Sequence, residues 1–286
     1  MTAQTFLRMG VAVKGRANPK TIEKVAQKAE EEGYDYLLVT DHYMQPNFNG
    51  HPEVWTLLAY LAAKTSRIRL GTCVTPLPFR PPAMLAKTIA TLDNLSGGRV
   101  ILGAGFGWYE PEFDAFSTWR ENKERIAYSR EALKLMTRLW SEKEPIDSDG
   151  RIKAKGLVVE PKPLQRPHPP IWWGGHLSQS LQTAGTLADG WMPIGPRWFD
   201  ESYPKPEQYA EMHRIIGGLL KKRGLREEDF TFTILISIAD IKTLSKDVEK
   251  YIDAGMNHFT LGHNVTSEDA VADVSKVMRE IGRSLK

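Results

Sequence analysis

Residues 68–103 read IRLGTCVTPLPFRPPAMLAKTIATLDNLSGGRVILG and contain a complete strand–helix–strand unit. The two ends, residues 68–74 and 100–103, are short apolar runs of the kind that form buried strands. Between them, residues 84–95 have the spacing of a helix. This unit predicts two parallel strands joined by a helix.

The same alternation extends to both sides of this unit. Asn18 and Pro19 suit the start of a helix and Gly33 suits its end. The other predicted strands cover residues 6–13, 34–40, 171–173, 190–193, 230–238 and 258–261. The other predicted helices cover residues 18–32, 53–64, 122–140, 178–187, 206–223, 244–254 and 267–281. Eight strands and eight helices in strict order predict an α/β fold, a single (β/α)8 TIM barrel over residues 1–286.

The sequence also argues against one alternative fold and predicts an insertion in the barrel. A doubly wound sheet is the alternative, but residues 14–18 (KGRAN), after the first strand, lack the glycine fingerprint of that fold. Residues 145–170 interrupt the alternation and are rich in Pro, Gly and Lys, with one strand-like piece at residues 156–160. We therefore expect an insertion in the barrel there.

Composition narrows the class of protein. The chain has 286 residues, 41% of them apolar and 26% charged, and its net charge of +3 gives no reason to expect a nucleic-acid or membrane partner. No apolar run is long enough to span a bilayer, and MTAQTFLRMG at the start lacks the pattern of a signal peptide. The single cysteine, Cys73, excludes an internal disulfide, so we expect a cytoplasmic protein. No HExxH motif or His/Cys cluster predicts a metal site.

Unusual residues gather where the predicted strands end. Active sites of TIM barrels lie at that end of the barrel. The second strand is followed by residues 40–43 (TDHY), the fourth ends in residues 103–109 (GAGFGWY), the fifth gives residues 172–176 (WWGGH), and the eighth precedes His263. Each motif alone also fits an ordinary turn. Together, the aromatic walls and few polar groups predict a pocket for a planar heterocycle.

Three segments resemble the luciferase-like monooxygenase superfamily, and most closely its coenzyme F420-dependent oxidoreductase branch. They are AEEEGYDYLLVTDHY (residues 29–43), residues 61–113, which end in GFGWYEPEF, and PPIWWGGH (169–176) followed by LADGWMP (187–193). The resemblance implies a barrel whose cofactor ring lies against a bulge in the third strand, often with a non-prolyl cis peptide bond, here at Cys73–Val74. It implies contacts of the ring and its phosphate with Asp41, Thr72, Cys73, Val74, Gly105, Phe106, Gly107, Gly174, Gly175 and His176.

The resemblance also implies a chemistry. We expect coenzyme F420 to exchange a hydride with a small organic substrate, with His42 as proton donor or acceptor and Asp41 orienting His42 or bonding the ring. His51, Trp108 and Tyr109 are candidates for substrate contact. Trp108 stands where sugar-phosphate and alcohol dehydrogenases of the branch have a glutamate, so those two activities are not expected.

Alternatives remain open at this point. FMN is the alternative cofactor, in a monooxygenase that uses O2 and takes reduced flavin from a separate reductase. A non-catalytic flavin-binding or deazaflavin-binding protein is the alternative from a different class. Relatives imply a homodimer.

Overall fold

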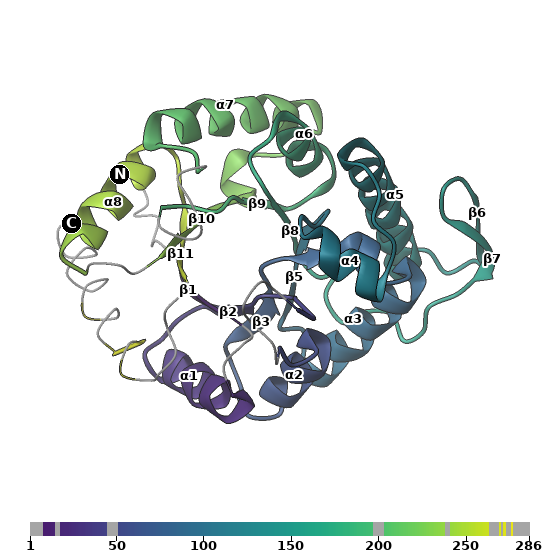
Figure 1. Ribbon diagram of the computed structural model, residues 1–286, viewed down its shortest axis with the longest axis horizontal. Coiled ribbons are helices and arrows are strands. Elements are labelled where there is room, and N and C mark those ends of the chain that lie inside the picture. The colour runs from purple at the N-terminus through teal and green to yellow at the C-terminus, as the bar shows by residue number, and fades with distance from the viewer. Residues whose placement is uncertain are drawn as a thin grey trace.

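The computed structural model describes residues 8–14, 18–44, 51–196, 203–237 and 241–262, together with 269, 271, 272 and 276. Within them, eight parallel strands form the wall of a barrel and helices surround it (Figure 1). The barrel strands are β1 (Arg8–Val13), β2 (Tyr36–Val39), β3 (Arg69–Thr72), β5 (Val100–Gly105), β8 (Ile171–Gly174), β9 (Gly190–Met192), β10 (Thr231–Ser237) and β11 (His258–Gly262). Their order around the wall is β3-β2-β1-β11-β10-β9-β8-β5, and β3 pairs with β5 to close it. The predicted barrel is confirmed.

The outer helices follow the strands in the predicted order. They are α1 (Pro19–Glu31), α2 (Val54–Ala62), α3 (Pro82–Ser96), α5 (Asn122–Ser141), α6 (Ser178–Leu187), α7 (Pro206–Lys222) and α8 (Ile241–Asp253). The predicted cap of the first helix is present, because the Asn18 side chain accepts a hydrogen bond from the Lys20 amide at 2.8 Å. Most of the predicted last helix, residues 267–281, and His263 lie outside the described residues.

The predicted third strand, residues 68–74, is interrupted. β3 ends at Thr72, the chain passes through a non-prolyl cis peptide bond between Cys73 and Val74, and β4 (Thr75–Pro76) then pairs again with β5. A 3-10 turn, η1 (Leu77–Phe79), leads on to α3. Close strand approach requires glycine here, since a Cβ on Gly103 would lie 1.8 Å from the Thr72 carbonyl oxygen. The cis bond occupies the position that the family resemblance implied.

Two additions lie outside the repeating pattern. Helix α4 (Glu110–Phe116) follows β5, where only a loop was expected. In the insertion, β6 (Ile146–Asp149) and β7 (Lys153–Leu157) form an antiparallel hairpin that projects beyond α3 and α5 (Figure 1). The expected strand at residues 156–160 was therefore wrong. Its true position, at 153–157, is mostly exposed and polar, so no apolar alternation indicated it.

The barrel interior is filled by its own small cluster of buried side chains. These are Ala12, Tyr36, Leu38, Cys73, Ile101, Trp172, Met192 and Leu235. A larger apolar cluster lies between the strands and the helices. This layer therefore separates the two ends of the barrel. Among the described residues, no helix is both long and apolar enough to cross a membrane.

Candidate active site

A cavity of about 450 Å³ opens at the ends of the strands where the sequence predicted a pocket. Ten of the predicted residues line it: His42, Cys73, Val74, Gly105, Phe106, Gly107, Trp108, Gly174, Gly175 and His176. Seven more were not predicted: Thr40, Pro76, Leu177, Ser180, Met192, Ile194 and Leu235. Among the described residues, no Lys, Arg, Asp or Glu lines the cavity. Its walls are thus suited to an uncharged, largely apolar group.

Val74 forms one wall, and glycines make room for its side chain. A Cβ on Gly105 would lie 2.7 Å from Val74 Cγ2, and one on Gly174 would lie 2.9 Å from Val74 Cγ1. Any larger residue at either position would collide with Val74. The two glycines and the bulge at Cys73–Val74 therefore shape one surface.

The far end of the cavity has unused hydrogen-bonding capacity. Gly175 has a positive φ of 93°, and a Cβ there would lie 2.9 Å from Ser180 Oγ. Ser180 stands in the first turn of α6 and is 1% exposed, and its hydroxyl oxygen has no hydrogen-bond partner among the described residues. Buried hydroxyl groups are nearly always paired, and a helix N-terminus attracts anions. This end of the cavity is therefore suited to a polar or anionic group of a ligand.

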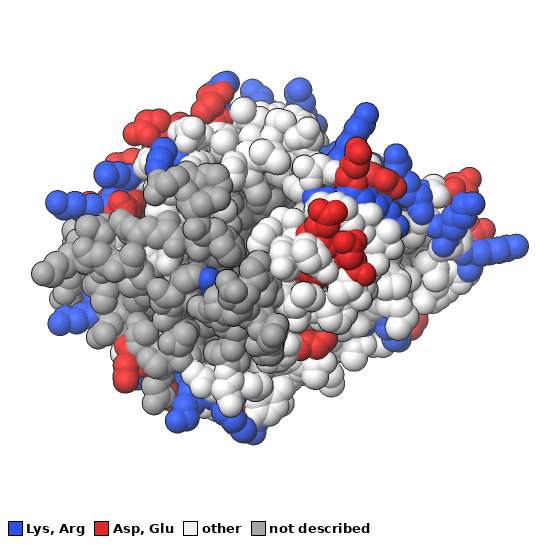
Figure 2. All heavy atoms as spheres, in the orientation of Figure 1, with Lys and Arg blue, Asp and Glu red and all other residues white. Residues whose placement is uncertain are grey.

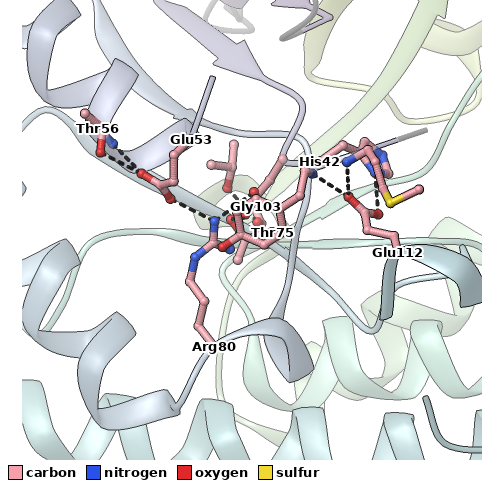
Figure 3. Close-up of polar contacts among 11 residues, drawn as sticks. His42, Glu53, Thr56, Thr75, Arg80, Gly103 and Glu112 are labelled. Carbon is pink, nitrogen blue, oxygen red and sulfur yellow. Dashed lines mark hydrogen bonds and ion pairs between the residues drawn. The ribbon is translucent and has the colours of Figure 1, made fainter. Parts of the chain in front are cut away.

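His42, at the end of β2, is held by a carboxylate from α4. Glu112 is 1% exposed, and its Oε2 lies 2.9 Å from His42 Nδ1 (Figure 3). Its Oε1 accepts hydrogen bonds from the amides of Tyr43, at 2.5 Å, and Met44, at 3.1 Å. Because a carboxylate oxygen can only accept a hydrogen bond, His42 Nδ1 carries the proton of the ring. The other ring nitrogen, Nε2, has no hydrogen bond in the described part of the chain. The ring nitrogen that can exchange protons with a ligand is therefore Nε2.

Asp41 has other partners, which corrects the expectation that it orients His42. Its carboxylate accepts from Arg80 Nη1 at 2.7 Å and Nη2 at 3.0 Å, and from Thr75 Oγ1 at 2.8 Å. Arg80 also donates to Glu53 Oε1 at 2.8 Å, and Glu53 caps α2. Asp41 is 1% exposed and does not line the cavity. The acidic side chain next to His42 in sequence thus joins β2, β4 and α2.

Burial and mutual attraction act in opposite directions on the two members of this ion pair. Burial raises the pKa of the Asp41 carboxyl, although Arg80 and the Thr75 hydroxyl oppose the shift. For Arg80, burial works against the charged form, but the charge and hydrogen bonds of Asp41, with smaller contributions from Tyr43 and Glu53, together outweigh it and raise the pKa of the guanidinium. Arg80 is therefore charged at neutral pH.

Three other predicted residues do not line the cavity. Thr72 is buried, and its hydroxyl donates to the Gly103 carbonyl at 2.8 Å, which joins β3 to β5. The His51 ring lies 5.9 Å from the His42 ring, and the Tyr109 ring lies 5.3 Å from that of Trp108. Trp108 does line the cavity and is 55% exposed. In Figure 2, acidic side chains lie over α4 beside this loop, and most Lys and Arg side chains lie near the outer edge of the face.

Comparison with known protein families gives a match over nearly the whole chain. The family model described as luciferase-like monooxygenase matches residues 1–283. An F420-dependent glucose-6-phosphate dehydrogenase of Kineococcus radiotolerans is 43% identical over 186 residues, which are 64% of this chain and 54% of the relative. An FMNH(2)-dependent dimethylsulfone monooxygenase of Pseudomonas putida is 31% identical over 175 residues, 60% of this chain and 48% of the relative. The matched segments thus span about half the length of these two relatives.

A solved structure supports the fold. It is an F420-dependent secondary alcohol dehydrogenase in complex with an F420-acetone adduct, with a TM-score of 0.83. The match covers 96% of this chain and 99% of that chain at 19% identity. At this identity, the likeness concerns the barrel itself.

Proposed function

The chain belongs to the luciferase-like monooxygenase family, and from that premise we propose that it is an oxidoreductase that uses coenzyme F420 to exchange a hydride with a small organic substrate. The observation that carries the proposal is the cavity itself. One wall of the cavity is the apolar side chain of Val74, for which neighbouring glycines leave room. The same cavity contains the imidazole of His42, which Glu112 holds in a fixed orientation. The 43% identity to a relative named as F420-dependent favours the deazaflavin over FMN.

The residues of the cavity fit such a cofactor. Val74 would support one face of the ring, and Gly105 and Gly174 leave room for it. Ser180 Oγ, together with the amides around Gly175, would hold the phosphate, which gives the unpaired hydroxyl a partner. When bound, the deazaflavin supplies or accepts a hydride at C5.

The remaining work falls to the side chains of this chain. His42 Nε2 would give a proton to the substrate or take one from it, while Glu112 keeps the proton of the ring on Nδ1. Trp108 and the apolar lining would exclude water from the reacting atoms. Alignment of donor and acceptor within about 3–3.5 Å supplies much of the rate in such transfers.

The substrate is not expected to be a sugar phosphate or a simple alcohol. Trp108 occupies the position at which the branch's dehydrogenases for those substrates carry a glutamate. Glu112 stands four residues further on, and its carboxylate is engaged with His42 and two amides. This expectation stays a prediction.

The second candidate function is an FMN-dependent monooxygenase. The relative named as FMNH(2)-dependent favours it, at 31% identity. The same apolar cavity would then protect reduced flavin from water.

The cofactor is tested by titrating the purified protein with coenzyme F420 and with FMN while absorbance is followed. We expect F420 to bind at least about tenfold more tightly, and Ser180→Ala to weaken that binding about tenfold. Ser178→Ala, an exposed serine in the same turn of α6, is the matched control and should bind as the wild type does. Tighter binding of FMN, with oxygen uptake by the reduced flavin complex, would favour the second candidate.

The role of His42 is tested separately. His42→Ala should keep cofactor affinity and lose turnover by about 10²–10⁴-fold with any substrate that the wild type converts. Undiminished turnover would remove His42 from the mechanism.

A further inference from the structure

A second cavity lies at the opposite end of the barrel, where the strands begin. Its volume is about 650 Å³, against about 450 Å³ for the cavity at the strand ends. Its lining comes from the first residues of β1, β3, β10 and β11 and from the loop that leads into β8. The floor is Trp172, a member of the interior layer that separates the two ends. We call this space the arginine cavity, after Arg8, Arg69 and Arg166, which line it.

The hydrogen-bond partners that the structure describes for these arginines are neutral groups. Arg69 Nη2 donates to the neutral Gln165 Oε1 at 2.8 Å, and Arg166 Nη1 donates to the Pro163 carbonyl at 2.7 Å. Arg8 has no hydrogen bond or ion pair with any described residue. None of the three forms an ion pair with a carboxylate in the described ranges.

Three carboxylates, Asp189, Glu228 and Asp229, also line the arginine cavity, and each has a partner other than its three arginines. Glu228 and Asp229 both pair with Arg226, the latter at 2.8 Å. Asp189 accepts the Ile171 amide at 2.9 Å and lies 3.7 Å from His168 Nδ1.

Two acidic side chains lie farther from the cavity and are also engaged. Asp35 accepts the Met9 amide at 2.8 Å, and Asp93 accepts both the amide and the side-chain nitrogen of Gln165, at 2.9 and 2.7 Å. The positive charge of the arginines is therefore not neutralised within a hydrogen bond's reach.

This arrangement of charges is electrostatically unfavourable for the protein alone. Burial, with the charge of Arg8, lowers the pKa of the Arg69 guanidinium, although the charges of Asp93 and Asp35 oppose the shift. His258 also lines the cavity, and its buried Nδ1 has no hydrogen-bond partner among the described residues. Burial, with the charges of Arg8 and Arg69, lowers its pKa to about 3, so the ring is neutral. An anion in this cavity would reduce the repulsion between the arginines and could pair with His258 Nδ1.

We propose that the arginine cavity binds a small phosphate-bearing anion through Arg8, Arg69 and Arg166. Guanidinium groups bind phosphate oxygens through paired, charge-assisted hydrogen bonds. Gln165, fixed by Asp93 and by the Val100 carbonyl, keeps Arg69 in place. Trp172 and His258 add aromatic edges beside the arginines, with ring centroids 5.7 Å apart. This site is separate from the one that would hold the cofactor.

The test is isothermal titration calorimetry of the full chain, in phosphate-free buffer at constant ionic strength. The probes are inorganic pyrophosphate and AMP. We expect one saturable site, and the double variant Arg8→Gln, Arg166→Gln should weaken binding at least about tenfold. The matched control is Arg138→Gln, because Arg138 pairs with Glu142 on the surface, away from the cavity.

Each outcome decides the proposal. Tighter binding of AMP would support it and identify an aromatic organophosphate, and tighter binding of pyrophosphate would support it and identify an inorganic ligand. No saturable heat with either probe would overturn it, as would equal binding by wild type and double variant. Ser180→Ala assigns the location: loss of pyrophosphate binding in that variant would place the anion in the other cavity and overturn the proposal. If the double variant does not fold, Arg8→Gln alone repeats the test, since Arg8 has no hydrogen bond or ion pair with any residue that the structure describes.

Discussion

We expect His258 to make the stability of this protein depend on pH. The ring packs against Tyr36, at 5.9 Å between ring centroids, and edge-on to Trp172, at 5.7 Å. Burial, assisted by the charges of Arg8 and Arg69, lowers its pKa from 6.5 to about 3. In the unfolded chain this histidine has its ordinary pKa. Between pH 6.5 and about 3, the unfolded chain therefore binds a proton at His258 that the folded chain does not bind.

The sign and size follow from this difference in pKa. Because the folded-state pKa is depressed, the stability associated with His258 is present above pH 6.5 and is lost as the pH falls from 6.5 towards 3. At pH 5, the unfolded state gains about 2 kcal/mol from protonation of this ring, whereas the folded state gains almost nothing. At pH 7.5 neither state gains appreciably.

The perturbation is His258→Phe, which keeps a ring between Tyr36 and Trp172 and removes the titrating group. Urea unfolding at pH 7.5 and at pH 5 gives the free energy of unfolding for both proteins. Between these pH values, the wild type should lose about 2 kcal/mol more than the variant. Any change in packing affects both pH values equally and cancels in the comparison.

A second variant tests the cause. Arg8→Gln removes one of the charges that lower the pKa of His258, so its extra loss of stability at pH 5 should be smaller than that of the wild type. Equal losses in wild type and His258→Phe would refute the reasoning, since they would mean that the folded protein protonates His258 as readily as the unfolded chain does.

Two further predictions concern the barrel and its mouth. In Glu112→Gln, the side-chain oxygen can still accept hydrogen bonds from the amides of Tyr43 and Met44, but the new NH2 group would donate to His42 Nδ1. The ring proton of His42 should therefore move to Nε2, which the NMR shifts of the histidine ring nitrogens report. The free energy of unfolding should fall by about 1–2 kcal/mol. An unchanged tautomer would contradict the assigned hydrogen bond. Gly103→Ala should lower the free energy of unfolding in urea by about 3 kcal/mol or more, because its Cβ would lie 1.8 Å from a backbone oxygen. The matched control is Gly218→Ala in α7, where a Cβ has open space around it. This variant should raise the free energy of unfolding by about 1 kcal/mol. Equal effects of the two alanines would show that the close approach of β3 and β5 relaxes.

The fold was predictable because it is repeated locally. Each strand and helix of the barrel shows its own period and its own end signals, as Asn18, Pro19 and Gly33 do for α1. Where the local signal is weak, the prediction failed. Lys153–Leu157 pairs with an equally exposed strand, so burial leaves no alternation in its sequence.

The site was predictable where the backbone sets the requirement. Gly105, Gly174 and Gly175 stand where a side chain does not fit, and such positions are legible as glycine-rich motifs. The hydrogen-bond partners of His42 and Asp41 could not be predicted, because they are distant in sequence. Glu112 is 70 residues from His42, and Arg80 is 39 residues from Asp41. Nothing in the sequence near Asp41 and His42 distinguishes which of the two meets which partner, because that is decided by how η1 and α4 fold over the strand ends.

Glu112 also has a consequence for how proteins of this shape can diverge. One carboxylate on the segment after β5 fixes two backbone amides and the histidine that follow β2, so these segments form a mechanical unit. A loop transplanted from a relative after β5 would take this anchor away and release Tyr43 and Met44, even if every barrel residue stayed the same. New substrate preferences built through the β5 segment should therefore arise together with compensating changes after β2, and chimaeras that exchange both segments should keep an ordered histidine where single exchanges lose it.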